Sequence, residues 1–175
     1  MNRRFSVLAL VTIAVAGLAS GCDTSDRPRE LSLDNVQPCD LVSRADLLQV
    51  DVIASPQAVP AIPGVDEDGT SCYYSPRSSA NLILAPVTNH GIDRWTSGSM
   101  ESSKAVNQPR IRGYPAVKVE TEGFPAGPHD DCELYVDVAS GQSLKVEASE
   151  NEPRELPTCD IARQLAEDAI RSLER

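Results

Sequence analysis

The sequence predicts an α+β domain: an antiparallel sheet of about five strands with a C-terminal helix and a short N-terminal helix packed on it, held by two disulfides. Short stretches between residues 71 and 148 alternate apolar and polar side chains, as half-buried antiparallel strands do. Residues 158–173 change to the helical period, with apolar side chains along one stripe. Besides Cys22 the chain has four cysteines, and an even number indicates disulfides in an exported chain: Cys39, Cys72, Cys132 and Cys159.

The amino-terminal residues have the organisation of a bacterial lipoprotein leader. Arg3 and Arg4 precede a mostly apolar run, Phe5–Ala19, which is shorter than the roughly 20 residues that a membrane-spanning helix needs. Small residues then precede Cys22, as in a lipobox, although Ala19 stands where Leu is more usual. We therefore expect residues 1–21 to be a signal peptide and Cys22 to carry diacylglycerol. The alternative is a plain secreted protein that leaves Cys22 as an odd thiol.

The mature chain is expected to have two parts. Residues 22–37 are polar and carry charges of both signs, so we interpret them as a flexible tether. A single extracytoplasmic α+β domain is expected over residues 38–175, a length that supports a core of its own. Its first element is a short helix from about residue 44 to 50, because Ser43-Arg44-Ala45-Asp46 resembles a capping box ahead of Leu47.

The middle of the chain alternates between loops and strands. Residues 54–69 are expected to form a long loop, because they contain three prolines and end in Asp66-Glu67-Asp68-Gly69. The remaining ligands of an EF-hand are missing, which favours a solvated loop over a calcium site. Strands are expected at 71–75, 81–87, 116–121, 132–138 and 144–148, loops at 97–110 and 123–131, and a short helix with Trp95 at 91–97.

The strand that begins at Cys132 has the clearest alternation. Its two faces are expected to differ, with Cys132, Leu134, Val136 and Val138 toward the core and Glu133, Tyr135 and Asp137 toward solvent. The C-terminal helix is expected to be capped by Thr158, with Asp160 favourably placed in its first turn.

The positions of the cysteines suggest a pairing. Cys72 and Cys132 both lie on inward strand faces, and Cys39 and Cys159 both lie at helix starts. We therefore predict Cys72–Cys132 and Cys39–Cys159. A metal site is disfavoured, because no two cysteines have the close spacing of a zinc knuckle.

Charge and composition exclude several functions. The net charge of −10 repels phosphate backbones, so we expect no nucleic-acid partner. The leader carries basic residues and no acid, so the mature part is more acidic still. Wide contact with anionic lipid is therefore unfavourable, and the acyl chains would have to hold the protein at the membrane. Aromatic residues make up 4% of the chain, which is too few for an aromatic-lined sugar groove.

The sequence contains few candidates for a catalytic site. His129-Asp130-Asp131 could act in acid–base or metal chemistry, but a loop after Gly127-Pro128 explains these residues better, and His90 is equally weak. Gly113-Tyr114-Pro115 could rim a binding face, although a structural role is favoured. No nucleophile elbow, P-loop or dinucleotide fingerprint occurs. We therefore assign no catalytic residue, cofactor or metal.

Five short motifs occur in order along the domain: Pro38-Cys39-Asp40-Leu41-Val42, Cys72-Tyr73-Tyr74, Gly113-Tyr114-Pro115-Ala116, Cys132 with its alternating strand, and Thr158-Cys159-Asp160-Ile161-Ala162. Together with the leader, they resemble the actinobacterial lipoproteins known as domain of unknown function 3558. Family members often have Trp in place of Tyr74. The resemblance implies an envelope-anchored, extracytoplasmic domain and no known reaction.

Two functions are consistent with these observations. The favoured one is a non-enzymatic binding or accessory module on the extracytoplasmic face of the cell membrane, anchored through Cys22, that binds an envelope protein, a peptide or a lipid. It predicts a concave or apolar patch on the sheet and no cluster of perturbed titratable groups. The alternative is a small envelope hydrolase that uses His129 and the neighbouring acids.

Overall fold

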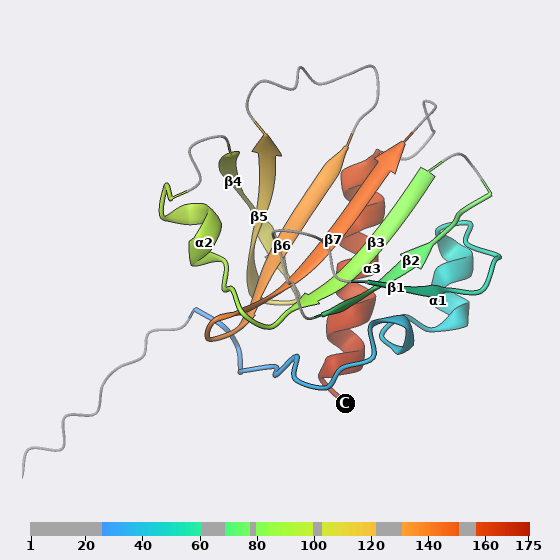
Figure 1. The fold of residues 1–175 in the computed structure, drawn as a ribbon, viewed down its shortest axis with the longest axis horizontal. Coiled ribbons are helices and arrows are strands. Elements are labelled where there is room, and N and C mark those ends of the chain that lie inside the picture. The colour runs from blue at the N-terminus through green and yellow to red at the C-terminus, as the bar shows by residue number, and fades with distance from the viewer. Residues whose placement is uncertain (1–25, 61–68, 78–79, 100–102, 122–130, 151–156) are drawn as a thin grey trace, which may run out of the picture.

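The computed structural model describes residues 26–60, 69–77, 80–99, 103–121, 131–150 and 157–175. In these residues an antiparallel sheet of seven strands carries a long C-terminal helix on one face (Figure 1). The α+β class, the antiparallel sheet, the C-terminal helix and the two disulfides are confirmed, but the sheet is larger than the five strands expected. In the order β1-β2-β3-β7-β6-β5-β4, the strands are Gln57–Pro60, Thr70–Tyr74, Ala80–Val87, Gln142–Glu150, Cys132–Ala139, Tyr114–Thr121 and Ser103–Ile111.

The two unexpected strands are the edges of the sheet. β1 and β4 lie where loops were predicted, and their side chains are mostly exposed or half-buried. An edge strand that buries little has no need of strict alternation, so the pattern that reveals a strand is weak there. Pro109 and the side chain of Arg163 also protect β4, because Arg163 donates to the carbonyl oxygens of Pro109 at 2.7 Å and Arg110 at 3.3 Å.

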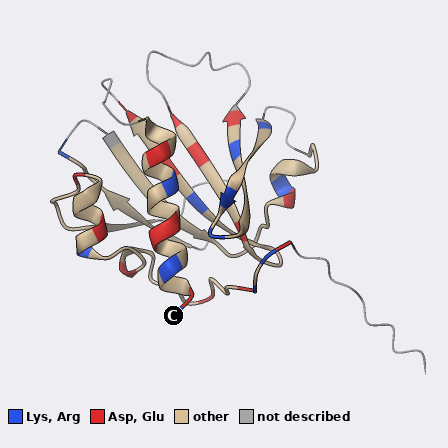
Figure 2. Cartoon of the chain, turned by 180° about the vertical axis from the view of Figure 1, so that it is seen from behind, with Lys and Arg blue, Asp and Glu red and all other residues tan. Residues whose placement is uncertain are grey.

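The helix α3, Thr158–Leu173, covers one face of the sheet, which we call the helix face (Figure 2). Its apolar stripe joins the inward side chains of β2, β3, β6 and β7 in one core. Thr158 is not the cap, because Pro157 precedes the helix and Thr158 is itself buried. The buried stripe of α3 consists of Ile161, Ala162, Leu165, Ala166, Ala169 and Ile170.

Two short helical segments precede the sheet. The 3-10 turn η1, Pro38–Asp40, contacts β2 and accepts the Tyr74 hydroxyl at the Pro38 carbonyl, 3.3 Å away. The helix α1, Arg44–Gln49, begins where the capping box predicted, with the Asp46 N–H donating to Ser43 Oγ at 3.2 Å. It lies beside α3.

Residues 26–37, which lie within the expected tether, pack against the domain instead. The Leu31 N–H donates to the Val138 carbonyl at 2.8 Å, and Leu31 and Leu33 belong to the main core. Two leucines among polar residues are too few to show a period, which is why the sequence did not reveal this packing. The folded unit therefore begins before Pro38, and residues 22–25 lie outside the described part of the chain.

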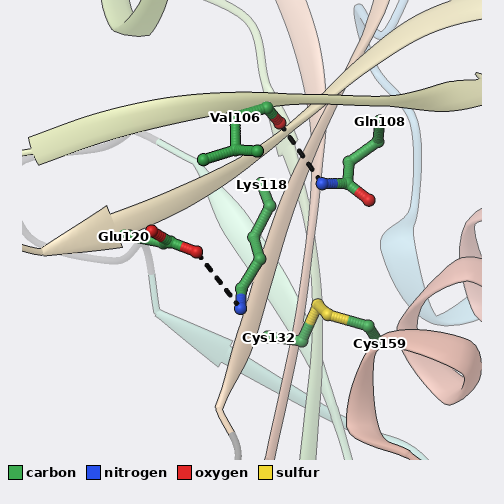
Figure 3. The surroundings of a disulfide bond; sticks show 6 residues. All are labelled: Val106, Gln108, Lys118, Glu120, Cys132 and Cys159. Carbon is green, nitrogen blue, oxygen red and sulfur yellow. Dashed lines mark hydrogen bonds and ion pairs between the residues drawn. A yellow bond between two sulfur atoms is a disulfide. The ribbon is translucent and has the colours of Figure 1, made fainter. Parts of the chain in front are cut away.

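The predicted disulfide pairing is wrong. The bonds are Cys39–Cys72 and Cys132–Cys159, with Cα–Cα distances of 5.0 and 5.1 Å. β2 and β6 are separated by β3 and β7, so Cys72 and Cys132 are about three strand spacings, or roughly 14 Å, apart. The observed bonds instead join η1 to β2 and the first turn of α3 to β6, and Figure 3 shows the second of these beside the Lys118–Glu120 ion pair.

Candidate functional site

A polar cluster lies at the centre of the sheet face opposite α3, which we call the opposite face. The hairpin β6–β7 turns at Ser140-Gly141 and pairs Glu133 with Glu147 and Tyr135 with Lys145. Side chains that alternate with the core residues of these strands must point away from α3. The register therefore places all four side chains together on the opposite face.

Lys145 bridges two carboxylates that would otherwise repel each other. Its Nζ lies 2.8 Å from Glu133 Oε1 and 3.0 Å from Glu147 Oε2, and only 4% of the residue is exposed. Burial by itself lowers the pKa of Lys145, but the two carboxylates outweigh burial and the pKa is raised. A charged ammonium is a poor nucleophile, so this lysine is suited to holding charge in place.

Tyr135 is fully buried on this face, although the sequence placed it in solvent. Its hydroxyl donates to Glu133 Oε1 at 2.8 Å, and burial together with the charge of Glu133 raises its pKa. The Trp95 ring lies 4.6 Å from the Tyr135 ring, and the Arg94 guanidinium lies 5.4 Å from the Trp95 centroid. With Lys145 Nζ 6.0 Å from the Tyr135 centroid, the four side chains form a stack that we call the aromatic column: Arg94, Trp95, Tyr135 and Lys145.

A single helical turn carries two members of the aromatic column, Arg94 and Trp95. The helix α2, Asp93–Thr96, lies within the predicted segment 91–97 and is, among the described residues, the only helix on the opposite face (Figure 1). Ile92 and Trp95 pack on a second apolar cluster that comprises Val87, Val117, Val119 and Tyr135. Ser143 Oγ also donates to the His90 carbonyl at 3.0 Å, which fastens the chain just before α2 to β7.

The column has the chemistry of a recognition surface. Trp, Tyr and Arg are the residue types that most often carry binding energy at protein interfaces, because they combine large contact area with a polar group. Trp95 is the chain's only tryptophan and is half-buried, so part of its surface is accessible. No group of three His, Cys, Asp or Glu residues suited to a metal ion occurs in the described ranges.

A surface hollow of about 410 Å³ lies between α1 and α3, away from the aromatic column. It is lined by Asp46, Gln49, Asp160, Arg163, Gln164, Glu167, Asp168 and Arg171. Arg171 bridges the helices here, at 2.8 Å from Asp168 and 3.8 Å from Asp46. Because every lining residue is polar and several are already paired, this hollow differs from the mostly apolar pockets that hold small ligands.

The residues singled out from the sequence do not converge on one site. Cys22, His129 and Asp130 lie outside the described residues, as do the acids of the 66–68 cluster. His90 is half-buried and contributes its carbonyl group to the hydrogen bond with Ser143. The four other cysteines all form disulfides.

Gly113-Tyr114-Pro115 has the structural role that the sequence favoured. Gly113 has φ +89° at the turn between β4 and β5, and a Cβ there would lie 2.8 Å from Pro28 Cγ. Tyr114 is buried in the main core. Glycine is therefore needed both for the backbone angle and for the close approach of the amino-terminal segment.

Sequence reasoning missed the aromatic column. One signal was available: pairing the two strands across the Ser140-Gly141 turn sets Tyr135 opposite Lys145 and Glu133 opposite Glu147. Arg94 and Trp95 give no such signal, because only the tertiary fold brings α2 to β6.

Comparison with known proteins identifies a family for the chain but no curated or structural relative. A family model described as protein of unknown function (DUF3558) matches residues 15–172. Neither the curated proteins nor the solved structures contain a match. None of the described helices is both long and apolar enough to cross a membrane.

Proposed function

Because the chain belongs to the DUF3558 family of proteins of unknown function, which supplies no reaction, we propose a role from its own residues: a membrane-anchored, extracytoplasmic lipoprotein that acts as a non-enzymatic binding or accessory module in the actinobacterial cell envelope. Its ligand is an envelope protein, peptide or lipid that docks on the opposite face of the sheet.

The observation that carries this proposal is the aromatic column. Arg94 and Trp95, both half-buried and stacked over the buried Tyr135, present recognition side chains on the sheet face that α3 leaves free. Preorganised aromatic side chains lose little conformational entropy on binding, which favours affinity.

The titratable groups also support binding over catalysis, although the binding hypothesis predicted no cluster of perturbed groups and Lys145 and Tyr135 form one. The pKa values of Lys145 and Tyr135 are both raised. Each shift stabilises the form that reacts least, the protonated amine and the neutral phenol, whereas a base or nucleophile needs the opposite shift.

The placement outside the cytoplasm rests on the leader and on the cysteines. Both disulfides join the amino-terminal and carboxyl-terminal elements to the sheet, which suits an oxidising compartment. Cys22 is then left as the cysteine available for lipid. The hydrolase alternative depends on His129, which lies outside the described residues.

Photocrosslinking in intact cells tests the binding proposal. A photoreactive residue replaces Ile83, which pairs with Glu147 on the opposite face, and in a matched variant it replaces Glu167 on α3. We expect a distinct protein or lipid adduct at Ile83, absent at Glu167 and lost in Trp95→Ala. Identical adducts at both positions, unaffected by Trp95→Ala, would refute the opposite face as the binding surface.

A further inference from the structure

The amino-terminal segment is fixed to one end of the domain, which we call the anchor end and which consists of the β4–β5 turn, the β6–β7 turn and the last turn of α3 (Figure 1). We infer that the anchor end lies against the lipid headgroups and that the opposite end of the sheet points away from the membrane. This inference rests on the proposed lipid anchor at Cys22.

A half-buried ion pair attaches the segment to the sheet. Arg27 Nη1 lies 2.7 and 2.8 Å from the two carboxylate oxygens of Asp137, and Arg27 Nη2 lies 2.6 Å from Glu30 Oε1. The Arg27 and Asp137 side chains are only 9% and 14% exposed. This charge-assisted contact is costly to break, because the half-buried Asp137 carboxylate would lose its guanidinium partner.

Further contacts fix the segment along both turns of the anchor end. Glu30 Oε2 accepts the Ser140 N–H at 2.7 Å in the β6–β7 turn. Asp26 Oδ2 lies 3.0 Å from Arg110 Nη2, and Pro28 packs against Gly113 in the β4–β5 turn. The chain is therefore held from Asp26 onward.

The chain between Cys22 and Arg27 is too short to let the domain turn over. Five Cα steps separate Cys22 from Arg27, so they span at most about 18 Å. β7 runs from the anchor end to the far end of the sheet over nine residues, a length of roughly 27 Å. Contact of the far end with the membrane would require Arg27 to lie farther from the bilayer than the free chain can reach.

Arginines offset part of the acidic charge at the anchor end. The protein carries a net charge of −10, but arginines pair with the acids of the anchor end. Arg112 lies 2.6 Å from Glu174, and Arg29 donates to the Glu174 carbonyl oxygen. Arg110 and Arg112 remain partly exposed, and guanidinium groups are well suited to phosphate. The α3 flank carries charges of both signs, Asp160 and Glu167 together with Arg163 and Arg171, and Figure 2 shows acidic and basic bands alternating along this helix.

Fluorescence quenching on the lipidated full chain tests the orientation. A fluorophore is attached at Ser140→Cys in the β6–β7 turn or at Ser75→Cys just after β2, and the protein is reconstituted in phosphatidylglycerol and phosphatidylethanolamine vesicles with nitroxide headgroups. We expect quenching to be several-fold stronger at Ser140 than at Ser75. Arg27→Gln should reduce this ratio toward one, whereas Lys118→Gln, which breaks an ion pair at the far end, should preserve it.

The outcomes separate this inference from the proposed function. Equal quenching at the two positions in protein that floats with the vesicles overturns the orientation but leaves the lipid anchor intact. Protein that does not float and whose Cys22 carries no acyl chains overturns the anchor itself. A ratio that Arg27→Gln leaves unchanged would show that the Arg27–Asp137 ion pair does not set the orientation.

Discussion

At the scale of single residues, Gly113 and Gly141 allow two effects of adding a side chain to be compared. One is the strain of a positive φ, and the other is a steric clash with a neighbouring residue. Gly113 and Gly141 have φ of +89° and +70°, but only at Gly113 would a Cβ meet another residue, Pro28. We expect Gly141→Ala to cost about 1 kcal/mol of unfolding free energy and Gly113→Ala about 2–3 kcal/mol. Urea unfolding of both variants measures the difference. Equal losses would mean that Pro28 does not pack on this turn.

Lys145 is expected to matter more than any exposed lysine. Lys145→Met leaves Glu133 and Glu147 facing each other on the sheet, so it should destabilise the fold by about 3–5 kcal/mol. Lys118→Met removes a more exposed pair with Glu120 at 3.6 Å and should cost about 0–1 kcal/mol. Chemical denaturation at neutral pH compares the two. A small loss for Lys145→Met would show that the carboxylates do not depend on it.

The buried tyrosines and Lys145 predict a loss of stability at alkaline pH. Burial raises the pKa of Tyr74 and Tyr135 above the ordinary 10.0, and the carboxylates raise that of Lys145 above 10.5. Groups with a raised folded-state pKa stabilise fully below the unfolded pKa and lose this contribution as the pH rises through the folded value. Stability should therefore fall above about pH 10.

Tyr135→Phe tests the source of this alkaline loss. The variant should show a shallower decline in unfolding free energy above about pH 10, because it removes one group that ionises only after unfolding. Tyr73→Phe serves as the control. Tyr73 also loses a hydrogen-bonded hydroxyl, which lies 2.6 Å from Asn81, but its side chain is half-buried whereas that of Tyr135 is fully buried. The same slope in Tyr135→Phe and the unaltered protein would contradict the assignment.

At the scale of elements, the disulfides replace contacts that short segments cannot supply. Cys39–Cys72 holds the three-residue turn η1, and Cys132–Cys159 holds the first turn of α3. Closing loops of 33 and 27 residues stabilises the fold by about 3.5 kcal/mol each in the chain-entropy model. Peptide mapping without reduction should recover these two linked peptides. A Cys72–Cys132 peptide would contradict the strand order.

The elements predicted correctly are those whose apolar residues recur with the period of a strand or a helix, because one face is buried. β6, β7 and α3 each present one apolar face to the core, so their period reveals them. β1 and β4 bury few side chains, so their sequences lack this apolar periodicity. The disulfide pairing and the aromatic column could not be predicted for a different reason: both depend on β3 pairing with β7 and on α2 meeting β6, which are long-range choices that no local pattern encodes.

At the scale of the whole molecule, the boundary of the folded unit decides how the domain meets its surroundings. A tether would leave a domain free to rotate and to reach distant partners, whereas a docked segment fixes its distance and its orientation. Leu31 and Leu33 lie in the main core, and Leu33 N–H donates to Gln142 Oε1 at 2.7 Å. Residues 26–37 are therefore part of the fold, and their removal should lower the stability of the whole domain.

A chain that begins at residue 38 tests this boundary against one that begins at residue 23. Leu31 and Leu33 contribute about 2 kcal/mol each, and the half-buried Asp137 would lose its partner Arg27, so the shorter chain should be less stable by about 4–6 kcal/mol. Leu33→Ala in the longer chain should reproduce about 2–5 kcal/mol of this loss, whereas Ser32→Ala, at an exposed position, should cost little. Equal urea midpoints for the two chains would restore the tether and remove the basis for a fixed orientation.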